Sequence, residues 1–373
     1  MRDLIRRIEA ATPPDRDRSV DALRAFAVAG VVLGHWLVTA LVVDSGTVGG
    51  SSPLRHLPLL VPVSWVFQTL AVFFLVGGLV STRGYARGVP YRAWVATRMA
   101  RLFRPVAAVL VVWVLVAGVL LASGVDPQTV RTPLRLVLSP LWFLLVFAVL
   151  TAATPLMSKV HPAWPLAVVA LVDVLRLGLS APAWLGWANL AAGWLVPYTI
   201  GAAWARGRLR DRTTLWVLLL GGALATAALV RWAGYPASMV GVPGDGFSNL
   251  NPPSLAAVTF GLAQCGAAGL LLGPLRRLMR RPAAWAAVAL VNLAAMTIFL
   301  WHQTAMIAVT ALGLLTGQRL PGLHTVPDGP AWVMARFGWL PVFALAMLVC
   351  CAAFHGYERV RPTRLKVTTT GSA

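Results

Sequence analysis

The sequence is poor in charge, in lysine and in cysteine. Only 12% of its 373 residues are charged, about half the roughly 25% that is usual in soluble domains. It has 12 acidic against 32 basic residues, and only Lys159 and Lys366 are lysines. The three cysteines, Cys265, Cys350 and Cys351, all lie in apolar runs. Their odd number and placement argue against a disulfide framework, and the scarcity of charge argues against an ordinary soluble protein.

Hydrophobic surface takes the place of the missing charge. Hydrophobic residues make up 58% of the chain, and the mean hydropathy is +0.75. A helix needs about 20 mostly apolar residues to cross a bilayer. The sequence therefore predicts an all-α, polytopic membrane helix bundle of about ten transmembrane helices, with residues 19–355 as one transmembrane domain. The ten apolar runs are 19–43, 59–80, 105–122, 136–157, 163–180, 185–205, 214–232, 254–272, 286–312 and 336–354.

Arginine supplies almost all of the net charge of +20 and is concentrated in short loops. The segment 81–105 holds six arginines and no acidic residue, and "RGRLRDR" and "GPLRRLMRRP" hold four each. If the helices alternate, these loops share one side with both termini, which the positive-inside rule makes cytoplasmic. We therefore expect a plasma-membrane protein with a cytoplasmic segment 1–18 and a disordered basic tail 356–373. Arginines in short loops argue against nucleic-acid binding, which needs an exposed basic face.

Two polar residues share one face of the first apolar run. Eleven residues separate Arg24 from His35, which leaves them about 20° apart around a helix and roughly 16 Å apart along it. An intramembrane histidine defaults to a functional role, and arginine pairs well with phosphate. Coenzyme A thioesters have a matching shape, and Arg98, Arg101 and Arg104 would extend the phosphate site. A snorkelling Arg24, arginines that only set the topology, and a structural His35 are the alternatives.

Four other residues join His35 as candidates for a substrate site. His302 lies about 24 Å into its run, Asp173 about 15 Å and Gln68 about 16 Å. Polar groups left unsatisfied in lipid are costly, so we expect these three to face a shared interior cavity with His35. Trp142, in "LWFLL", is a candidate wall for the acyl group.

Each of these candidates also has a structural interpretation. Asp173 and Arg176, three residues apart, would form a favourable helical ion pair, or Asp173 would orient His35. His302 would be a hydrogen-bonded structural residue, and Trp142 a packing or interface residue.

The segment "NPPS", residues 251–254, has two interpretations as well. It predicts a helix start, with Asn251 as the cap and Pro252 early in the helix. Alternatively, Asn251 or Asp245 would contact the substrate from an outer loop.

Four short segments carry a family pattern in the correct order. They are "VDALRAFAVAGVVLGH" (20–35), "FFLVGG" (73–78), "RMARLFRP" (98–105) and "FLWHQ" (299–303). Together they resemble the acyltransferase 3 superfamily of integral-membrane acyltransferases. The chain departs from that family in having Gly77 where a serine is frequent, and we expect no extracytoplasmic hydrolase-like domain of the kind that some members carry.

The resemblance implies transfer of an acetyl or other short acyl group from acyl-CoA to a hydroxyl. The acceptor would be a sugar, a glycolipid or another envelope or secreted molecule, with acyl-CoA as co-substrate and no metal or tightly bound cofactor. His35 would be the key residue, as general base or as a covalent acyl carrier, and the arginines would bind the donor. The alternatives are a proton-coupled transporter or flippase, although no matching halves are visible, and a binding or assembly role.

Overall fold

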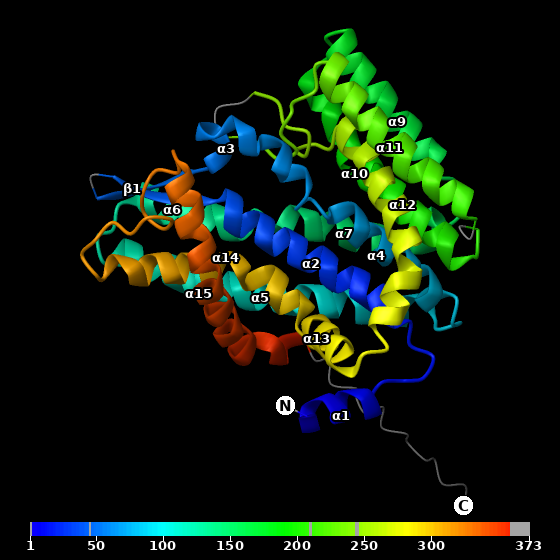
Figure 1. Ribbon diagram of the computed structural model, residues 1–373, viewed down its shortest axis with the longest axis horizontal. Coiled ribbons are helices and arrows are strands. Elements are labelled where there is room, and N and C mark those ends of the chain that lie inside the picture. The colour runs from blue at the N-terminus through cyan, green and yellow to red at the C-terminus, as the bar shows by residue number, and fades with distance from the viewer. Residues whose placement is uncertain (1, 45, 209–210, 243–245, 359–373) are drawn as a thin grey trace, which may run out of the picture.

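The computed structural model describes residues 2–44, 46–208, 211–242 and 246–358 (Figure 1). Within these residues nearly all regular structure is helical, and one antiparallel hairpin pairs β1 with β2. The elements are α1 (Arg2–Ala10), α2 (Arg18–Val38), β1 (Ala40–Asp44), β2 (Thr47–Ser51), α3 (Pro53–His56), η1 (Pro58–Trp65), α4 (Leu70–Tyr85), α5 (Tyr91–Ala122), α6 (Pro127–Leu138), α7 (Leu141–Ala152), α8 (Thr154–Met157), α9 (Ala163–Asp173), η2 (Val174–Gly178), η3 (Ala183–Trp187), α10 (Ala188–Ala205), α11 (Arg212–Trp232), α12 (Leu255–Leu278), α13 (Pro282–Leu293), α14 (Ala295–Leu314), α15 (Pro330–Phe354) and η4 (His355–Glu358).

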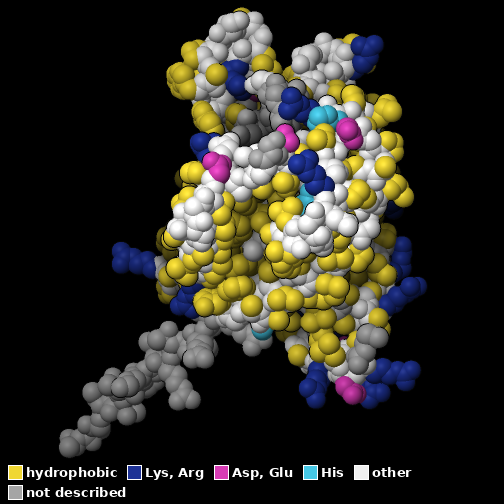
Figure 2. All heavy atoms as spheres, turned by 90° about the vertical axis from the view of Figure 1, so that its left-hand side faces the viewer, with side chains coloured by type: hydrophobic (Ala, Val, Ile, Leu, Met, Phe, Trp, Pro, Cys, Tyr) yellow, Lys and Arg dark blue, Asp and Glu magenta, His cyan; other side chains and the backbone are white. Residues whose placement is uncertain are grey.

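Eight helical segments of the described chain are long and apolar enough to cross a membrane. They are α2, η1 with α4, α5, α6 with α7, α11, α12, α14, and α15 with η4. Figure 2 shows hydrophobic side chains over most of one face of the molecule. The predicted all-α membrane bundle is therefore confirmed.

The predicted runs and the observed helices differ in two places. Runs 163–180 and 185–205 form α9 with η2, and η3 with α10, which are not among the eight segments. Run 286–312 divides at Ala294 between α13 and α14. The count of ten spans and the cytoplasmic termini stay predictions. Most of the expected basic tail, residues 359–373, lies outside the described residues.

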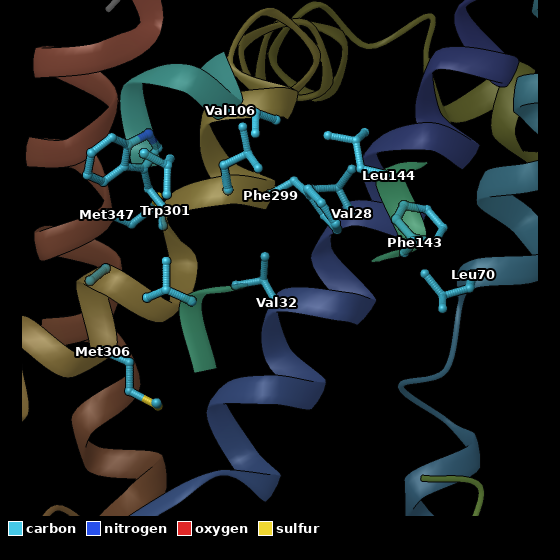
Figure 3. Packing of buried hydrophobic residues seen from close by; sticks show 14 of the residues in the cluster. Val28, Val32, Leu70, Val106, Phe143, Leu144, Phe299, Trp301, Met306 and Met347 are labelled. Carbon is cyan, nitrogen blue, oxygen red and sulfur yellow. The ribbon is translucent and has the colours of Figure 1, made fainter. Parts of the chain in front are cut away.

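Helix α2 lies in the middle of the main hydrophobic core. Its buried face packs against α4, α12, α13, α14 and α15, and Val28 and Val32 belong to a core cluster that also includes residues of α5 and α7. Figure 3 shows Val28 and Val32 of α2 among Phe299 of α14, Phe143 of α7 and Leu70 of α4. This packing leaves α2 few ways to shift along or around its axis, because close-packed interiors resist displacement.

A buried arginine holds the last turn of α2. The Arg336 side chain of α15 is 1% exposed. Its Nε donates to the Trp36 carbonyl at 2.6 Å, and its Nη2 donates to the Thr39 carbonyl at 2.5 Å. Its Nη1 donates to the Gly322 carbonyl at 2.8 Å. Carbonyls at a helix C-terminus lack intrahelical partners and carry partial negative charge. Arg336 therefore supplies hydrogen bonds to two carbonyls, those of Trp36 and Thr39, that follow His35 at the end of α2.

One end of the bundle carries both ends of the described chain. Helix α1 packs against α13 (Figure 1). Glu358 of η4 accepts hydrogen bonds from Thr297 near the start of α14. The hairpin β1–β2 and α3 follow the opposite, C-terminal end of α2.

The tightest contact in the bundle joins α4 to α10 through two glycines. A Cβ atom on Gly78 would lie 2.0 Å from the Tyr198 carbonyl oxygen, and one on Gly201 would lie 1.9 Å from the Leu75 carbonyl oxygen. Only glycine allows backbones to approach so closely. Beside this contact, a Cβ on Gly77 would meet the Phe147 ring at 2.3 Å, which gives a physical reason for the missing serine.

We therefore expect Gly201→Ala to destabilise the protein by about 1–3 kcal/mol, because an added methyl group overpacks the contact. Thermal unfolding in detergent measures the effect. The matched control is Gly118→Ala near the C-terminal end of α5, where an added Cβ meets nothing within 4 Å and alanine favours the helix. Equal melting temperatures for the two variants would contradict the close-contact interpretation.

Candidate active site

A cavity of about 680 Å³ lies against the last turns of α2. Its wall is formed by α2, the hairpin, η1, the start of α7, α14 and described residues of 240–242 and 246–251. His35, Gln68, Trp142 and Gln303 all line it. The described lining residues include no Asp, Glu, Lys or Arg. The cavity is therefore a mixed apolar and neutral-polar site, with His35 as the side chain best suited to acid–base chemistry.

His35 is held by a neighbouring amide. Its Nδ1 lies 3.0 Å from Nε2 of Gln303, which is 1% exposed. Oε1 of the same amide is buried and has no hydrogen-bond partner. With Nδ1 engaged, Nε2 is the His35 nitrogen left for a substrate.

His302 lies behind His35 and does not line the cavity. It is fully buried, and its ring centroid is 5.0 Å from that of His35. Its Nδ1 lies 2.6 Å from the Phe299 carbonyl oxygen, to which it donates, while its Nε2 has no partner. The structure thus brings the two predicted histidines together, but only His35 reaches the cavity.

Gln68 and Trp142 both lie on the cavity wall. Oε1 of Gln68 accepts a hydrogen bond from the Leu70 backbone N–H at 3.1 Å. The Trp142 indole lies beside Trp194, with ring centroids 6.3 Å apart. Because Trp142 presents a flat apolar surface beside neutral polar groups, it provides a face on which a ligand ring can pack.

Asn251 also reaches the cavity, but not as a helix cap. Ser254 caps α12 instead, with its hydroxyl accepting from the Ala257 N–H at 3.3 Å. The prediction that Asn251 caps this helix is wrong, because the two prolines after it keep the chain non-helical up to Ser254. Asn251 lines the cavity. Asp245 lies outside the described residues.

The predicted arginines lie away from this cavity. On α2 the cavity wall begins at Val31, seven residues and about 10 Å from Arg24. Nε of Arg24 donates to Oδ1 of Asn292, and its Nη2 lies 3.8 Å from Oδ1 of Asp21. Between Arg24 and His35, Val28 and Val32 are buried and belong to the main core cluster.

The arginines of α5 are arranged in two ways. Arg98 is partly buried, with its guanidinium 5.3 Å from the Trp94 ring centroid. It also donates to the Val80 carbonyl at 3.4 Å. Arg101 and Arg104 are exposed. None of the three lines the cavity, so any anion they bind would lie at a separate site.

Asp173 is part of a structural hydrogen-bond network, not of the cavity. It is 1% exposed, and its carboxylate accepts from Asn189 Nδ2 at 2.8 Å, Tyr235 Oη at 2.9 Å and the Leu255 N–H at 2.6 Å. Burial, together with the Asp173 charge, raises the pKa of Tyr235, so the phenol remains a donor. Among the described residues Asp173 makes no ion pair, with Arg176 or any other residue, and it does not contact His35. These contacts correct the expectation of a shared cavity.

Two important side chains were missed by sequence reasoning. Gln303 follows His302 in "FLWHQ", but nothing in the sequence shows that its amide meets His35. Arg336 begins an apolar run and looks like a boundary residue, and only the fold shows it buried at the end of α2. The residues that the structure describes contain no cluster of three His, Cys, Asp or Glu that would hold a metal ion.

Comparison with known families gave one match that covers nearly the whole chain. A family model of the acyltransferase 3 type, described as "Acyltransferase domain", matches residues 17–355. No curated protein and no solved structure gave a match.

We expect Asp173→Ala to destabilise the protein by about 3 kcal/mol or more, because it leaves Asn189, Tyr235 and the Leu255 N–H without their charged acceptor. Thermal unfolding in detergent measures the loss. Asp328→Ala, at an exposed position, is the control and should stay within about 0.5 kcal/mol of wild type. An unchanged melting temperature for Asp173→Ala would contradict a structural role for this carboxylate.

Proposed function

Because the chain belongs to the acyltransferase 3 family of membrane acyltransferases, we propose that it transfers an acyl group from acyl-CoA to a hydroxyl group at the His35 cavity. The acyl group is acetyl or another short acyl chain. Acyl-CoA is a co-substrate, and no cofactor is tightly bound. The observation that carries the proposal is an intramembrane histidine, His35, whose Nδ1 contacts Gln303 and which lines a cavity of about 680 Å³ with no charged lining residue among those described.

His35 acts as general base in this proposal. Its neutral imidazole takes the proton of the acceptor hydroxyl as that oxygen attacks the thioester carbonyl. The carbon–sulfur bond then breaks, and the departing coenzyme A thiolate takes the proton from the imidazolium. The products are an ester and a free thiol. A covalent acyl-histidine intermediate would involve the same side chain.

The cavity lining supports a neutral, hydroxyl-rich acceptor such as a sugar or glycolipid headgroup. The described wall combines amides and hydroxyls (Gln68, Asn251, Ser52 and Ser248) with the flat face of Trp142. Neutral donors and acceptors beside an aromatic surface suit a polyol, while a charged acceptor would find no counterion. The loops over the cavity lie opposite the arginine-rich loops, so the acceptor enters from the extracytoplasmic side of the plasma membrane.

The arginine side supports an anionic donor. Arg24 of α2 and Arg98 of α5 are partly buried. Arg101 and Arg104, which follow Arg98 on α5, are exposed. One guanidinium group can donate two parallel hydrogen bonds to the oxygens of a phosphate. This geometry suits the phosphorylated nucleotide of coenzyme A. Delivery of the thioester to His35 then requires the packing around Val28 to open.

The family match gives no support to the alternative of a proton-coupled transporter or flippase. A transporter would move its substrate unchanged. Acceptor-dependent release of free thiol from acyl-CoA by the purified protein distinguishes the two classes directly.

We expect His35→Ala to lower acyl transfer by about 10²–10⁴-fold, the usual contribution of a general base. The assay measures thiol released from acetyl-CoA in the presence of envelope glycan extract, and gel filtration in detergent checks folding. His161→Ala, at an exposed position, is the matched control. A correctly folded His35→Ala protein that transfers at the wild-type rate would refute the proposed base.

We expect Arg98→Ala to raise the KM for acetyl-CoA about tenfold with a smaller change in kcat, because it removes a charged contact made equally in ground and transition states. Arg231→Ala, exposed in the last turn of α11, controls for the loss of a positive charge. An unchanged KM would remove Arg98 from the donor site.

A further inference from the structure

We propose that Gln303 is a positioning residue that keeps a proton on Nδ1 of His35, so that Nε2 is free to act as the base. This inference rests on the proposed function, because it assigns the partner of the proposed catalytic histidine. It starts from the contact between the Gln303 amide and His35 Nδ1, which are 3.0 Å apart.

The two neutral forms of a histidine differ in which nitrogen carries the hydrogen. Nε2 can take the proton of the substrate hydroxyl only when the imidazole hydrogen is on Nδ1. In that form Nδ1–H must donate, and the group opposite it must be an acceptor. Gln303 is the residue that lies opposite Nδ1, and its amide oxygen is the acceptor it can offer.

The amide of Gln303 has an unused acceptor. In the structure its Nε2 faces His35, while its Oε1 is buried without a partner. A half-turn about the last side-chain torsion, which is broad and roughly two-fold, exchanges the two atoms. The exchange brings the unpaired oxygen to the Nδ1–H of His35. The orientation of the amide and the position of the His35 proton are therefore coupled, and the base-competent state has Oε1 towards His35.

The other polar side chains considered above do not make this contact. His302 has its Nδ1 committed to the Phe299 carbonyl, and its Nε2 makes no hydrogen bond to His35. Asp173 lies outside the cavity, with its carboxylate oxygens occupied by Asn189, Tyr235 and the Leu255 N–H. The described residues that line the cavity include no carboxylate. Gln303 thus takes the place that an acidic residue occupies in many catalytic triads.

An amide suits this place within an apolar bundle. A carboxylate buried beside His35 would be costly in a membrane whenever the imidazole is neutral. Gln303 can fix the proton position without adding a charge, and the imidazolium needs to exist only briefly during transfer. The Gln303 side chain is 1% exposed, and the preceding turn of α14 packs in the main hydrophobic core. Its position is therefore well defined.

Two substitutions of Gln303 separate this role from simple packing. Gln303→Met has similar size but no strong acceptor, and we expect it to lower kcat by about 10² or more, with the KM for acetyl-CoA within about threefold of wild type. Gln303→Glu keeps an acceptor oxygen, and we expect it to recover at least a tenth of the wild-type kcat. Gln128→Met, at an exposed position of α6, is the matched control and should retain full activity.

The results have distinct meanings. A folded Gln303→Met protein with more than half of the wild-type kcat overturns the inference. So does a folded Gln303→Glu protein that is no more active than Gln303→Met. If His35→Ala is itself active, the proposed function fails instead, so the two failures are distinguishable.

A measurement without turnover gives a second test. The ¹⁵N spectrum of histidine-labelled protein distinguishes Nδ1–H from Nε2–H, and a His35→Ala sample assigns the signal. We expect His35 to carry its proton on Nδ1 in the wild type and in Gln303→Glu, and to lose this preference in Gln303→Met. The same proton position in wild type and Gln303→Met would overturn the inference.

Discussion

The position of the proposed catalytic histidine depends on a buried guanidinium. Arg336 donates to the carbonyls of Trp36 and Thr39, at the C-terminal end of α2, and to Gly322. Among the described residues it has no acidic partner within 4 Å, so the negative end of the helix is its main electrostatic partner. A helix end and an arginine that would each be costly alone in a membrane therefore satisfy each other. The result is a fixed last turn that presents His35.

The rest of the site is built around that turn. Gln303 of α14 reaches His35 from one side, while the hairpin that continues from α2 covers another. The Val43 N–H donates to the His324 carbonyl at 3.0 Å, and this contact ties the hairpin to the segment that precedes α15. Helix α14 and the hairpin, which both line the cavity, are thus connected to the end of α2 and to the segment before α15. This shared framework explains why a loop-rich region can hold a defined site.

The sequence predicted the fold class and the central helix because both depend on local periodicity. Apolar runs of the right length identify membrane helices, and an eleven-residue spacing places Arg24 and His35 on one face. In the structure these residues contact α13 and α14, which are consecutive helices. The sequence could not show that Asn189, Tyr235 and the Leu255 N–H donate to the Asp173 carboxylate, because those partners are distant in the chain. The same hydrogen bonds replace the ion pair that was expected with Arg176.

The closed layer between Arg24 and His35 has a consequence for the cell as well as for the enzyme. Val28 and Val32 are almost fully buried there, with hydrophobic neighbours from several helices. Apolar packing of this kind leaves no room for a water chain. Along this stretch of α2 the membrane acyltransferase would therefore conduct neither water nor ions, which keeps that part of the bilayer electrically insulating.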